Sequence, residues 1–204
     1  MKFSTPSHKS DNFISNKISF LNDCEYHKVI ANNTIQKGEI LLIDYPKINL
    51  FGENEIDKGL QLTKKYIELN ENELYPRNNN FPRTTMIKNV HKIIKNTDKK
   101  LKDFFSNYSK DIIELYYAKY IFNAFEGWKY GPLTLPMVAK FNHSCNPNIE
   151  FNFNEEKGCM IVKSIKSIKK GSEIYDSYIV NKNLKDHKEY LYEHYGFICK
   201  DCLL

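Results

Sequence analysis

The segment FNHSCNPN, residues 141–148, restricts the fold of this chain more than any other stretch of it. Its four central residues, Asn142 to Cys145, are polar and lie between Phe141 and the strand-like run IEFNF at 149–153. The Asn-Pro-Asn that follows them is typical of a turn, and Asn and Ser side chains in turns often bond to nearby backbone groups. One interpretation is therefore a turn that satisfies its own backbone, placed directly before a strand.

The first half of the chain changes from strand patterns to helical ones. Residues 28–31 (KVIA) and 40–43 (ILLI) are short apolar runs rich in β-branched residues, with the turn-forming pairs Asn-Asn and Lys-Gly between them. Helical spacing of apolar residues follows around 56–69, 86–105 and 109–125. In the last of these segments we expect one apolar stripe, formed by Ile112, Ile113, Tyr116, Tyr117, Tyr120 and Ile121.

Strand patterns return after residue 133. We expect strands at 149–153, 159–165 and 173–179, and a last helix at 185–197. This order of β-rich, helical and β-rich regions predicts an α+β domain of short strands, interrupted by a helical insertion at about 51–120. A length of 204 residues suits a single domain with such an insertion.

Composition excludes several classes of protein. The 30 Lys and Arg residues only slightly outnumber the 25 Asp and Glu residues and are scattered, so direct nucleic-acid binding is not expected. No apolar run approaches the roughly 20 residues of a membrane span, and the first residues lack the apolar core of a signal peptide. We therefore expect an intracellular protein, nuclear or cytoplasmic and not secreted, with no membrane partner. In a reducing compartment, thiols or metal ligands are expected rather than disulfides at the five cysteines, Cys24, Cys145, Cys159, Cys199 and Cys202.

The string NHSC-x-PN resembles the signature of the SET-domain protein-lysine methyltransferases, with six identities in seven positions. Three further segments resemble that family. Residues 169–179 (KKGSEIYDSYI) are similar to its K-x-G-E-E strand, 189–202 (EYLYEHYGFICKDC) to its cysteine tail, and 28–42 to its first strands. IFNAF at 121–125 resembles the SET-and-MYND branch, although 51–120 contains no cysteine and therefore no MYND zinc module.

This resemblance implies that S-adenosylmethionine donates a methyl group to the side-chain amine of an exposed lysine in a protein substrate, histone or non-histone. By their positions in the matching motifs, Tyr178 and Tyr195 are the implied catalytic residues, beside the transferring methyl and along the lysine channel. The implied cofactor-binding residues are Lys28, Asn123, Asn142, His143, Tyr178 and Phe197. The resemblance also implies a β-rich SET domain over 14–202, a threaded C-terminal segment, and a rudimentary post-SET tail at 199–204.

Elementary acid-base chemistry explains why tyrosines suit such a site. A free lysine has a pKa near ~10.4 and must lose its proton before it can attack a methyl group. An apolar, tyrosine-lined channel beside a positive sulfonium lowers that pKa through desolvation and like charge. Alignment of the amine with the methyl can then contribute roughly 7–11 kcal/mol.

The first cofactor loop departs from the family pattern. Its glycine pair, G-x-G, is absent, and Tyr26, His27 and Lys28 stand in its place. Glycines allow the backbone to approach a ligand closely, whereas bulky residues adopt positive φ only at a cost. A SET-derived protein-binding or peptide-binding module, weakly active or inactive, is therefore the alternative to an active enzyme.

The cysteine tail is also incomplete. Cys145, Cys199 and Cys202 offer three of the four ligands that structural zinc needs, and Asp201 stands where the family has its middle cysteine. A fourth ligand would have to come from Cys24, a histidine or Asp201. Zinc binding therefore stays an open expectation.

Overall fold

The computed structural model describes residues 11–22, 27–48, 50, 57–126, 131–179 and 186–203, with the backbone alone at Asn22, Glu126, Cys202 and Leu203. The chain forms two compact units. The first, called the β unit, comprises Met1–Lys47, Leu135–Lys188 and Ile198–Leu204, and the second, called the helical unit, comprises Ile48–Thr134 and Glu189–Phe197. The chain passes between the units several times, so each is assembled from segments that are distant in sequence.

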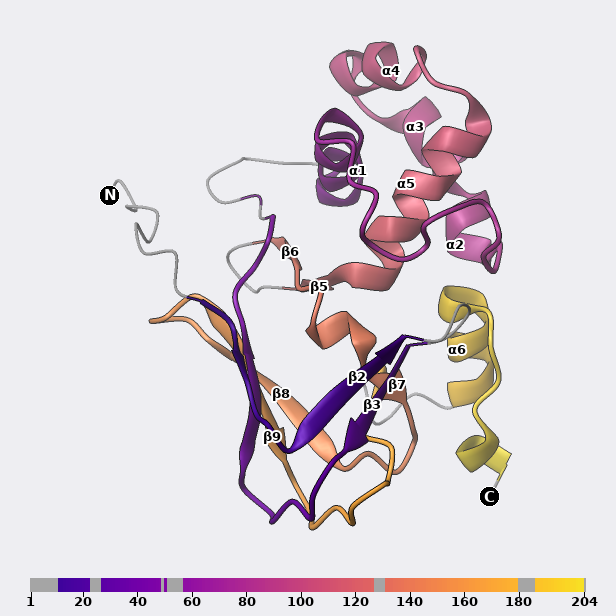
Figure 1. Ribbon diagram of the computed structural model, residues 1–204. Helices are drawn as coiled ribbons and strands as arrows, with labels where there is room; N and C mark the ends of the chain where they lie inside the picture. Colours follow the sequence, from indigo (N-terminus) through magenta and orange to yellow (C-terminus); the bar gives the residue numbers. More distant parts are fainter. Residues whose placement is uncertain are drawn as a thin grey trace. The chain divides into compact units, whose positions relative to one another are not determined.

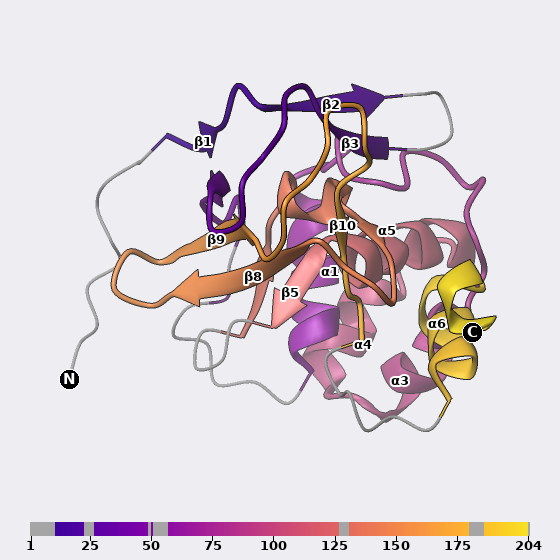
Figure 2. The same cartoon turned by 90° about the horizontal axis from the view of Figure 1, so that it is seen from below.

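The β unit is built from short strands (Figures 1 and 2). Its largest sheet has four strands in the order β1-β4-β9-β8, and two smaller sheets pair β2 with β3 and β10 with β7. The strands are β1 (Phe13–Ile14), β2 (Ile18–Asn22), β3 (His27–Ala31), β4 (Ile40–Asp44), β7 (Asn142–His143), β8 (Ile149–Asn154), β9 (Cys159–Ser164) and β10 (Tyr175–Asp176). The described part of this unit also contains the 3₁₀ helices η2 (Val138–Lys140) and η3 (Lys200–Leu203).

Buried apolar side chains stabilise these strands, and on β3 the buried positions alternate along the chain. On β3 the side chains of Val29 and Ala31 are buried, while the preceding Lys28 is exposed. Strands β4 and β9 pair antiparallel with Leu42 opposite Val162, and both of these side chains are fully buried. The strands predicted at 28–31, 40–43, 149–153 and 159–165 are confirmed as β3, β4, β8 and β9.

The strand expected at 173–179 is much shorter than predicted, because only Tyr175 and Asp176 form a ladder, as β10. Here the side chain of Asn148 bonds to backbone groups that a longer strand would pair. The backbone N–H of Tyr175 donates to Asn148 Oδ1 (2.9 Å), and Asn148 Nδ2 donates to the carbonyl oxygen of Glu173 (3.0 Å). Side-chain bonds of this kind satisfy backbone groups that a longer strand would otherwise pair.

The helical unit carries the helices predicted for the middle of the chain. They are α1 (Lys58–Glu68), α2 (Thr85–Lys88), α3 (Val90–Asn96), α4 (Lys99–Phe105) and α5 (Lys110–Asn123), followed by the strands β5 (Ala124–Glu126) and β6 (Pro132–Thr134). Helices α2, α4 and α5 begin at side-chain caps, where Thr84, Asp98 and Ser109 each accept a bond from the backbone N–H three residues on. The predicted C-terminal helix is confirmed as α6 (His187–Tyr195), most of which belongs to this unit.

The expectation of one apolar stripe on α5 was wrong. Ile112 is 40% exposed, and Ala118, Lys119 and Asn123, which lie outside the expected stripe, are buried. The reason is that α5 contributes to two apolar clusters, with Ile113 and Tyr117 in one and Tyr116 in the other. A helix covered on two sides buries polar positions too, and a single-face pattern cannot describe it.

The limits proposed for the domain (14–202), its insertion (51–120) and its post-SET tail (199–204) remain predictions, as does threading of the C-terminal segment. Among the described residues, no helix has the length and apolar character of a membrane span.

Candidate functional site

Two of the sequence motifs meet in the β unit. Strand β7, which begins the NHSC segment, runs parallel to β10, with Asn142 opposite Tyr175 and His143 opposite Asp176. The backbone N–H of Ser144 donates to the carbonyl oxygen of Asp176 (2.8 Å), which extends this pairing. A purely local turn would not require a distant strand, so the segment is part of a site built from two stretches of chain.

His143 holds the backbone of Tyr178. The N–H of Tyr178 donates to His143 Nδ1 (2.9 Å), and because a backbone N–H can only donate, Nδ1 is the unprotonated nitrogen. The proton of the neutral ring is then on Nε2, which lies 3.3 Å from Cys145 Sγ. Burial lowers the pKa of His143 to about 4, although the Asp201 carboxylate opposes that shift. His143 is therefore a neutral, fixed imidazole that orients its neighbours.

Tyr178 is held at its other end as well. Its hydroxyl donates to the carbonyl oxygen of Phe141 (2.8 Å), and its ring lies 5.3 Å from that of His143, measured between centroids. Phe141 itself is 1% exposed, with edge-on contacts to Phe20 and Phe151. The tyrosine is thus positioned by a neutral imidazole and by a carbonyl oxygen on a rigid apolar support.

The side chain of Asn142 is engaged through its nitrogen. Asn142 Nδ2 donates to the carbonyl oxygen of His27 and to Glu173 Oε1, both at 2.8 Å. Both partners are acceptors, so the nitrogen of the amide must face them. Among the described residues, no donor bonds to Oδ1 of the half-buried Asn142, and such an oxygen is the kind of acceptor that a bound ligand can use.

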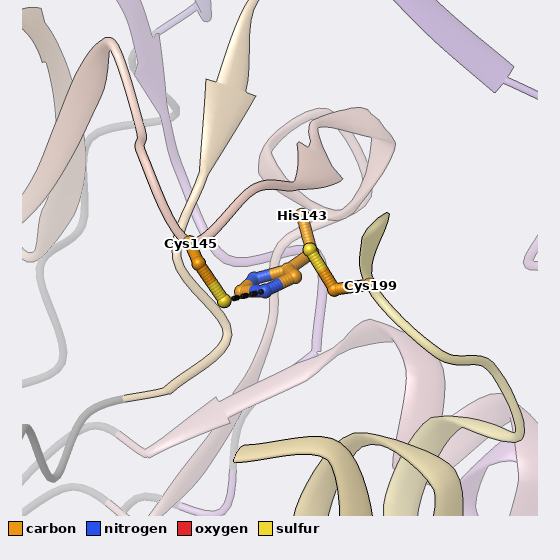
Figure 3. Close-up of side chains that lie close together, drawn as sticks. All are labelled: His143, Cys145 and Cys199. Atoms are coloured by element: carbon orange, nitrogen blue, oxygen red, sulfur yellow. Dashed lines mark hydrogen bonds between the residues drawn. The ribbon is translucent and has the colours of Figure 1, made fainter. Parts of the chain in front are cut away.

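Three potential ligand side chains converge beside this segment (Figure 3). A nitrogen of His143 and the sulfurs of Cys145 and Cys199 all lie within 4.8 Å of one another. For two thiolates on one tetrahedral zinc, a sulfur-sulfur distance of about 3.8 Å follows from Zn–S bonds of about 2.3 Å. The two cysteines therefore fit a metal after a small adjustment. His143 fits less well, because its Nδ1 accepts the Tyr178 N–H and its Nε2 carries the proton.

Of the remaining predicted zinc ligands, the structure describes some side chains and not others. Asp201 accepts a bond from Ser144 Oγ (2.5 Å), so its carboxylate is already engaged within the β unit. The side chain of Cys202 and all of Cys24 lie outside the described residues. Cys159, by contrast, is fully buried on β9.

Three predicted site residues belong to the helical unit. Asn123 is buried, and its Nδ2 donates to the carbonyl oxygens of Tyr75 (2.5 Å) and Lys119 (2.8 Å). Tyr195 ends α6, and its ring lies 6.4 Å from that of Phe197. The cofactor and channel roles of these residues remain predictions.

Lys28 lies on β3 in the β unit, with an exposed side chain and Leu21 as its pairing partner. Tyr26, which the sequence places beside it in the first cofactor loop, lies outside the described residues. The cofactor-binding role expected of Lys28 also remains a prediction.

Sequence reasoning missed two acidic residues. Glu173 bonds to Asn142 and also accepts a bond from the Tyr175 hydroxyl at Oε2 (2.9 Å). Burial raises the pKa of Asp176 to about 7, opposed only by a bond from the Ser177 N–H. Both residues lie within the matched segment 169–179, so the signal available was their position between a turn and Tyr178.

Solved structures share this arrangement of short strands and helices. Rubisco LSMT bound to sinefungin and monomethyllysine aligns with a TM-score of 0.59 at 18% identity, over 92% of this chain and 53% of that one. Rubisco LSMT bound to AdoMet aligns with a TM-score of 0.57 at 16% identity, over 91% and 52%. The SET domain of LSMT bound to lysine and AdoHcy aligns with a TM-score of 0.58 at 18% identity, over 89% of this chain and 53% of that one. The fold is therefore the SET fold, an α+β arrangement of helices with short antiparallel strands.

Sequence comparison agrees with the fold. The family model for the SET domain matches residues 27–179, well over half of the chain. This protein belongs to the SET-domain methyltransferase family.

Three relatives indicate where it stands within that family. A SET domain-containing protein of Acanthamoeba polyphaga mimivirus is 36% identical over 68% of this chain and 52% of its own length. A second, from Dictyostelium discoideum, is 30% identical over 95% of this chain and 51% of its own length. A SET and MYND domain-containing protein of the same organism is 40% identical over only 33% of this chain and 20% of its own length. The chain thus spans about half the length of the first two, and its similarity to the SET-and-MYND branch is distant and partial.

Proposed function

We propose that this protein transfers the methyl group of S-adenosylmethionine to the side-chain amine of a lysine in a protein substrate. The observation that carries the proposal is the junction of β7 and β10, where the NHSC segment and Tyr178 support each other. His143 accepts the backbone N–H of Tyr178, and Phe141 accepts its hydroxyl, so the tyrosine has one fixed position. Methyl transfer depends chiefly on alignment, which such rigid support favours.

The groups at this junction suit the cofactor. S-adenosylmethionine supplies a methyl group on a positively charged sulfonium, and it also carries a charged amine. Asn142 offers an amide oxygen for binding, and the Glu173 carboxylate lies beside that amide. Acceptor oxygens and a negative charge stabilise a cationic ligand, which favours this cofactor over an anionic one.

The tyrosine hydroxyl has a defined polarity. Because Tyr178 donates its only hydroxyl proton to Phe141, the oxygen can act toward another group as an acceptor. An acceptor can orient a lysine ammonium before its proton is lost, and it can orient the amine afterwards. We assign Tyr178 this orienting role. The side chain of Asn142 and the backbone of His143 are assigned the role of holding the cofactor, since the ring of His143 is engaged with Tyr178 and Cys145.

The test is transfer of labelled methyl from S-adenosylmethionine to proteins on an array, combined with calorimetric binding of S-adenosylhomocysteine. We expect Tyr178→Phe to reduce transfer by roughly 10²-fold through lost alignment, and Asn142→Ala to weaken cofactor binding. Tyr192→Phe is the matched control, because Tyr192 is 61% exposed, and it should be neutral. If the wild-type protein bound no S-adenosylhomocysteine at millimolar concentration, the proposal would be wrong. Tight peptide binding without methyl transfer would instead select the binding-module alternative.

The thiols form a second part of the proposal. Two thiols of the β unit lie close enough together to share a metal, at Cys145 and Cys199. Cys202 follows Cys199 by three positions, in the tail where the resemblance places a further zinc ligand. Zinc bound there would tie the C-terminal segment to the NHSC segment, and its role would be structural.

A further inference from the structure

Glu173 is fixed at both oxygens of its carboxylate. Oε1 accepts Asn142 Nδ2 (2.8 Å), and Oε2 accepts the hydroxyl of Tyr175 (2.9 Å). Hydrogen bonds to an ionised carboxylate are stronger than those between neutral groups. Glu173 is therefore a rigid acceptor that faces Asn142 rather than a surface acid that samples solvent.

The amide of Asn142 is oriented by two acceptors. Its nitrogen has two hydrogens, one directed to Glu173 Oε1 and the other to the carbonyl oxygen of His27. Loss of the carboxylate would leave one hydrogen without this acceptor and would allow the amide to rotate. Together with the carbonyl oxygen of His27, Glu173 therefore keeps Oδ1 as the atom of Asn142 that is available to a ligand.

The same contacts reach the place where the glycine pair is missing. His27 is the first residue of β3, and Glu173 forms an isolated bridge with Ile30 on that strand. The two neighbours of Glu173 in the chain bond to β3 through their backbone. The carbonyl oxygen of Ser172 accepts the N–H of Ala31 (2.9 Å), and the N–H of Ile174 donates to the carbonyl oxygen of Val29 (2.8 Å). Glu173 thus lies along β3 with its backbone and reaches the first residue of that strand through Asn142.

We propose that Glu173 is a positioning residue for cofactor binding, which acts through Asn142. It presents the amide of Asn142 as an acceptor, and through that amide it fixes the His27 end of β3. This inference rests on the proposed function, because it specifies how this chain prepares its cofactor wall.

The first test is a double-mutant cycle read by calorimetric binding of S-adenosylhomocysteine. Glu173→Ala and Asn142→Ala should each weaken binding roughly 10- to 100-fold, as expected for loss of a charged hydrogen bond. The double variant should bind about as weakly as Asn142→Ala alone, because Glu173 is proposed to act only through Asn142. Glu173→Gln, which keeps an acceptor for Asn142, should stay within about threefold of wild type.

The matched control is Glu39→Ala. Glu39 is also a partly buried glutamate of the β unit, but it bonds to Lys17 and to the N–H of Gln36. The Glu39→Ala substitution should therefore leave the affinity for S-adenosylhomocysteine unchanged. Fully additive losses in the double variant, or a Glu39→Ala loss as large as that of Glu173→Ala, would overturn the inference.

A second measurement does not need the cofactor. In the free protein, nitrogen-15 NMR follows hydrogen exchange of the Asn142 side-chain amide, assigned by its absence in Asn142→Ala. Glu173→Ala should accelerate this exchange at least about tenfold, because the bond that protects the amide is lost. Unchanged exchange would overturn the role of Glu173 even if the wild-type protein binds cofactor. Absence of cofactor binding in wild type, with faster exchange in Glu173→Ala, would refute the proposed function and the cofactor role but retain the Glu173–Asn142 coupling.

Discussion

Individual hydrogen-bonding atoms determine what the site can do. Nδ1 of His143 accepts a backbone N–H, and this single bond decides the tautomer of the ring and weakens it as a metal ligand. The amide nitrogen of Asn142 faces two acceptors, which leaves its oxygen for a ligand. At another site, a histidine or an asparagine could present its other nitrogen or oxygen to a ligand, so the role of each residue follows from its hydrogen-bond partners.

The carboxyl of Asp176 should make stability depend on pH. Burial raises its pKa from an ordinary value of 3.8 to about 7, so the folded state binds its proton more tightly than the unfolded state does. Stability from this group is therefore full below pH ~4 and is lost as pH rises toward 7. We expect Asp176→Asn to be more stable than wild type at pH 8, by a few kcal/mol at most, with no gain near pH 4.

Urea unfolding at a series of pH values measures this difference. Asp103→Asn is the control, because Asp103 is exposed and its substitution should change stability little at any pH. A variant at position 176 that lost stability at pH 8 would show that the carboxylate is stabilised by contacts that outweigh its burial.

At the scale of single elements, buried polar contacts shape a helix of this protein as much as its apolar sequence pattern does. Helix α5 carries a fully buried lysine, Lys119, whose Nζ donates to the carbonyl oxygens of Leu74 (3.0 Å) and Pro76 (2.8 Å). Asn123, one turn further on, holds the carbonyl oxygen of Tyr75. The C-terminal half of α5 thus fastens a loop through polar side chains, which explains why its buried face is not purely apolar.

Lys119 should give stability the opposite dependence on pH. Burial lowers its pKa from 10.5 to about 8, so the unfolded state binds more protons between those two values. Stability should therefore rise as pH increases from about 8 to 10.5, and Lys119→Met should abolish this rise. Thermal unfolding across that range measures it, with the exposed Lys100→Met as a control that keeps the slope. A slope unchanged in Lys119→Met would contradict the assignment.

The end of α6 depends on a glycine. Gly196 has φ +76°, its N–H donates to the carbonyl oxygen of Tyr192 (3.0 Å), and a Cβ there would lie 2.4 Å from Pro82 Cβ. We expect Gly196→Ala to cost more than the roughly 1–2 kcal/mol of backbone strain alone, because a steric clash is added. Gly171→Ala is the matched control, since Gly171 also has positive φ but an added methyl group there would meet nothing within 4 Å. Equal losses in urea unfolding would argue against the contact with Pro82.

At the scale of the whole molecule, the C-terminal segment returns to the β unit after α6. It brings Cys199 close to Cys145 and Asp201 to Ser144, residues far away along the chain. This part of the site is therefore assembled within the β unit from segments that are far apart in sequence, and Cys199 and Asp201 belong to it.

Metal content tests this assembly. We expect the purified protein to hold about one zinc per chain, and Cys145→Ser and Cys199→Ser each to lose it and to lower the unfolding temperature. A strong chelator should destabilise wild type and leave both variants unaffected. Cys159→Ser is the control for the loss of a thiol that lies outside the cluster. Zinc-free wild-type protein with unchanged stability in the two variants would exclude a structural metal at this cluster.

The sequence by itself determined the local elements and the family. The local elements depend on near neighbours in the chain, so they can be predicted without the structure. They include the apolar runs at 28–31 and 40–43, the alternation at 149–153 and the helical spacing in the middle of the chain. The NHSC segment and its partner motifs identified the SET fold for the same reason, since each is a short contiguous string. The stripe on α5 and the length of β10 could not be predicted in this way, because distant segments bury or pair those residues.

Tertiary structure alone decided how the site residues are used. Asn142 bonds to Glu173 and to His27, which lie 31 and 115 positions away, and the Tyr178 N–H reaches His143 across 35 positions. No local pattern reports such partners, because a hydrogen bond depends on atoms within about 3 Å and not on neighbours in sequence. The residues proposed to perform the chemistry could therefore be identified in the sequence, whereas the fold determines which atoms orient them.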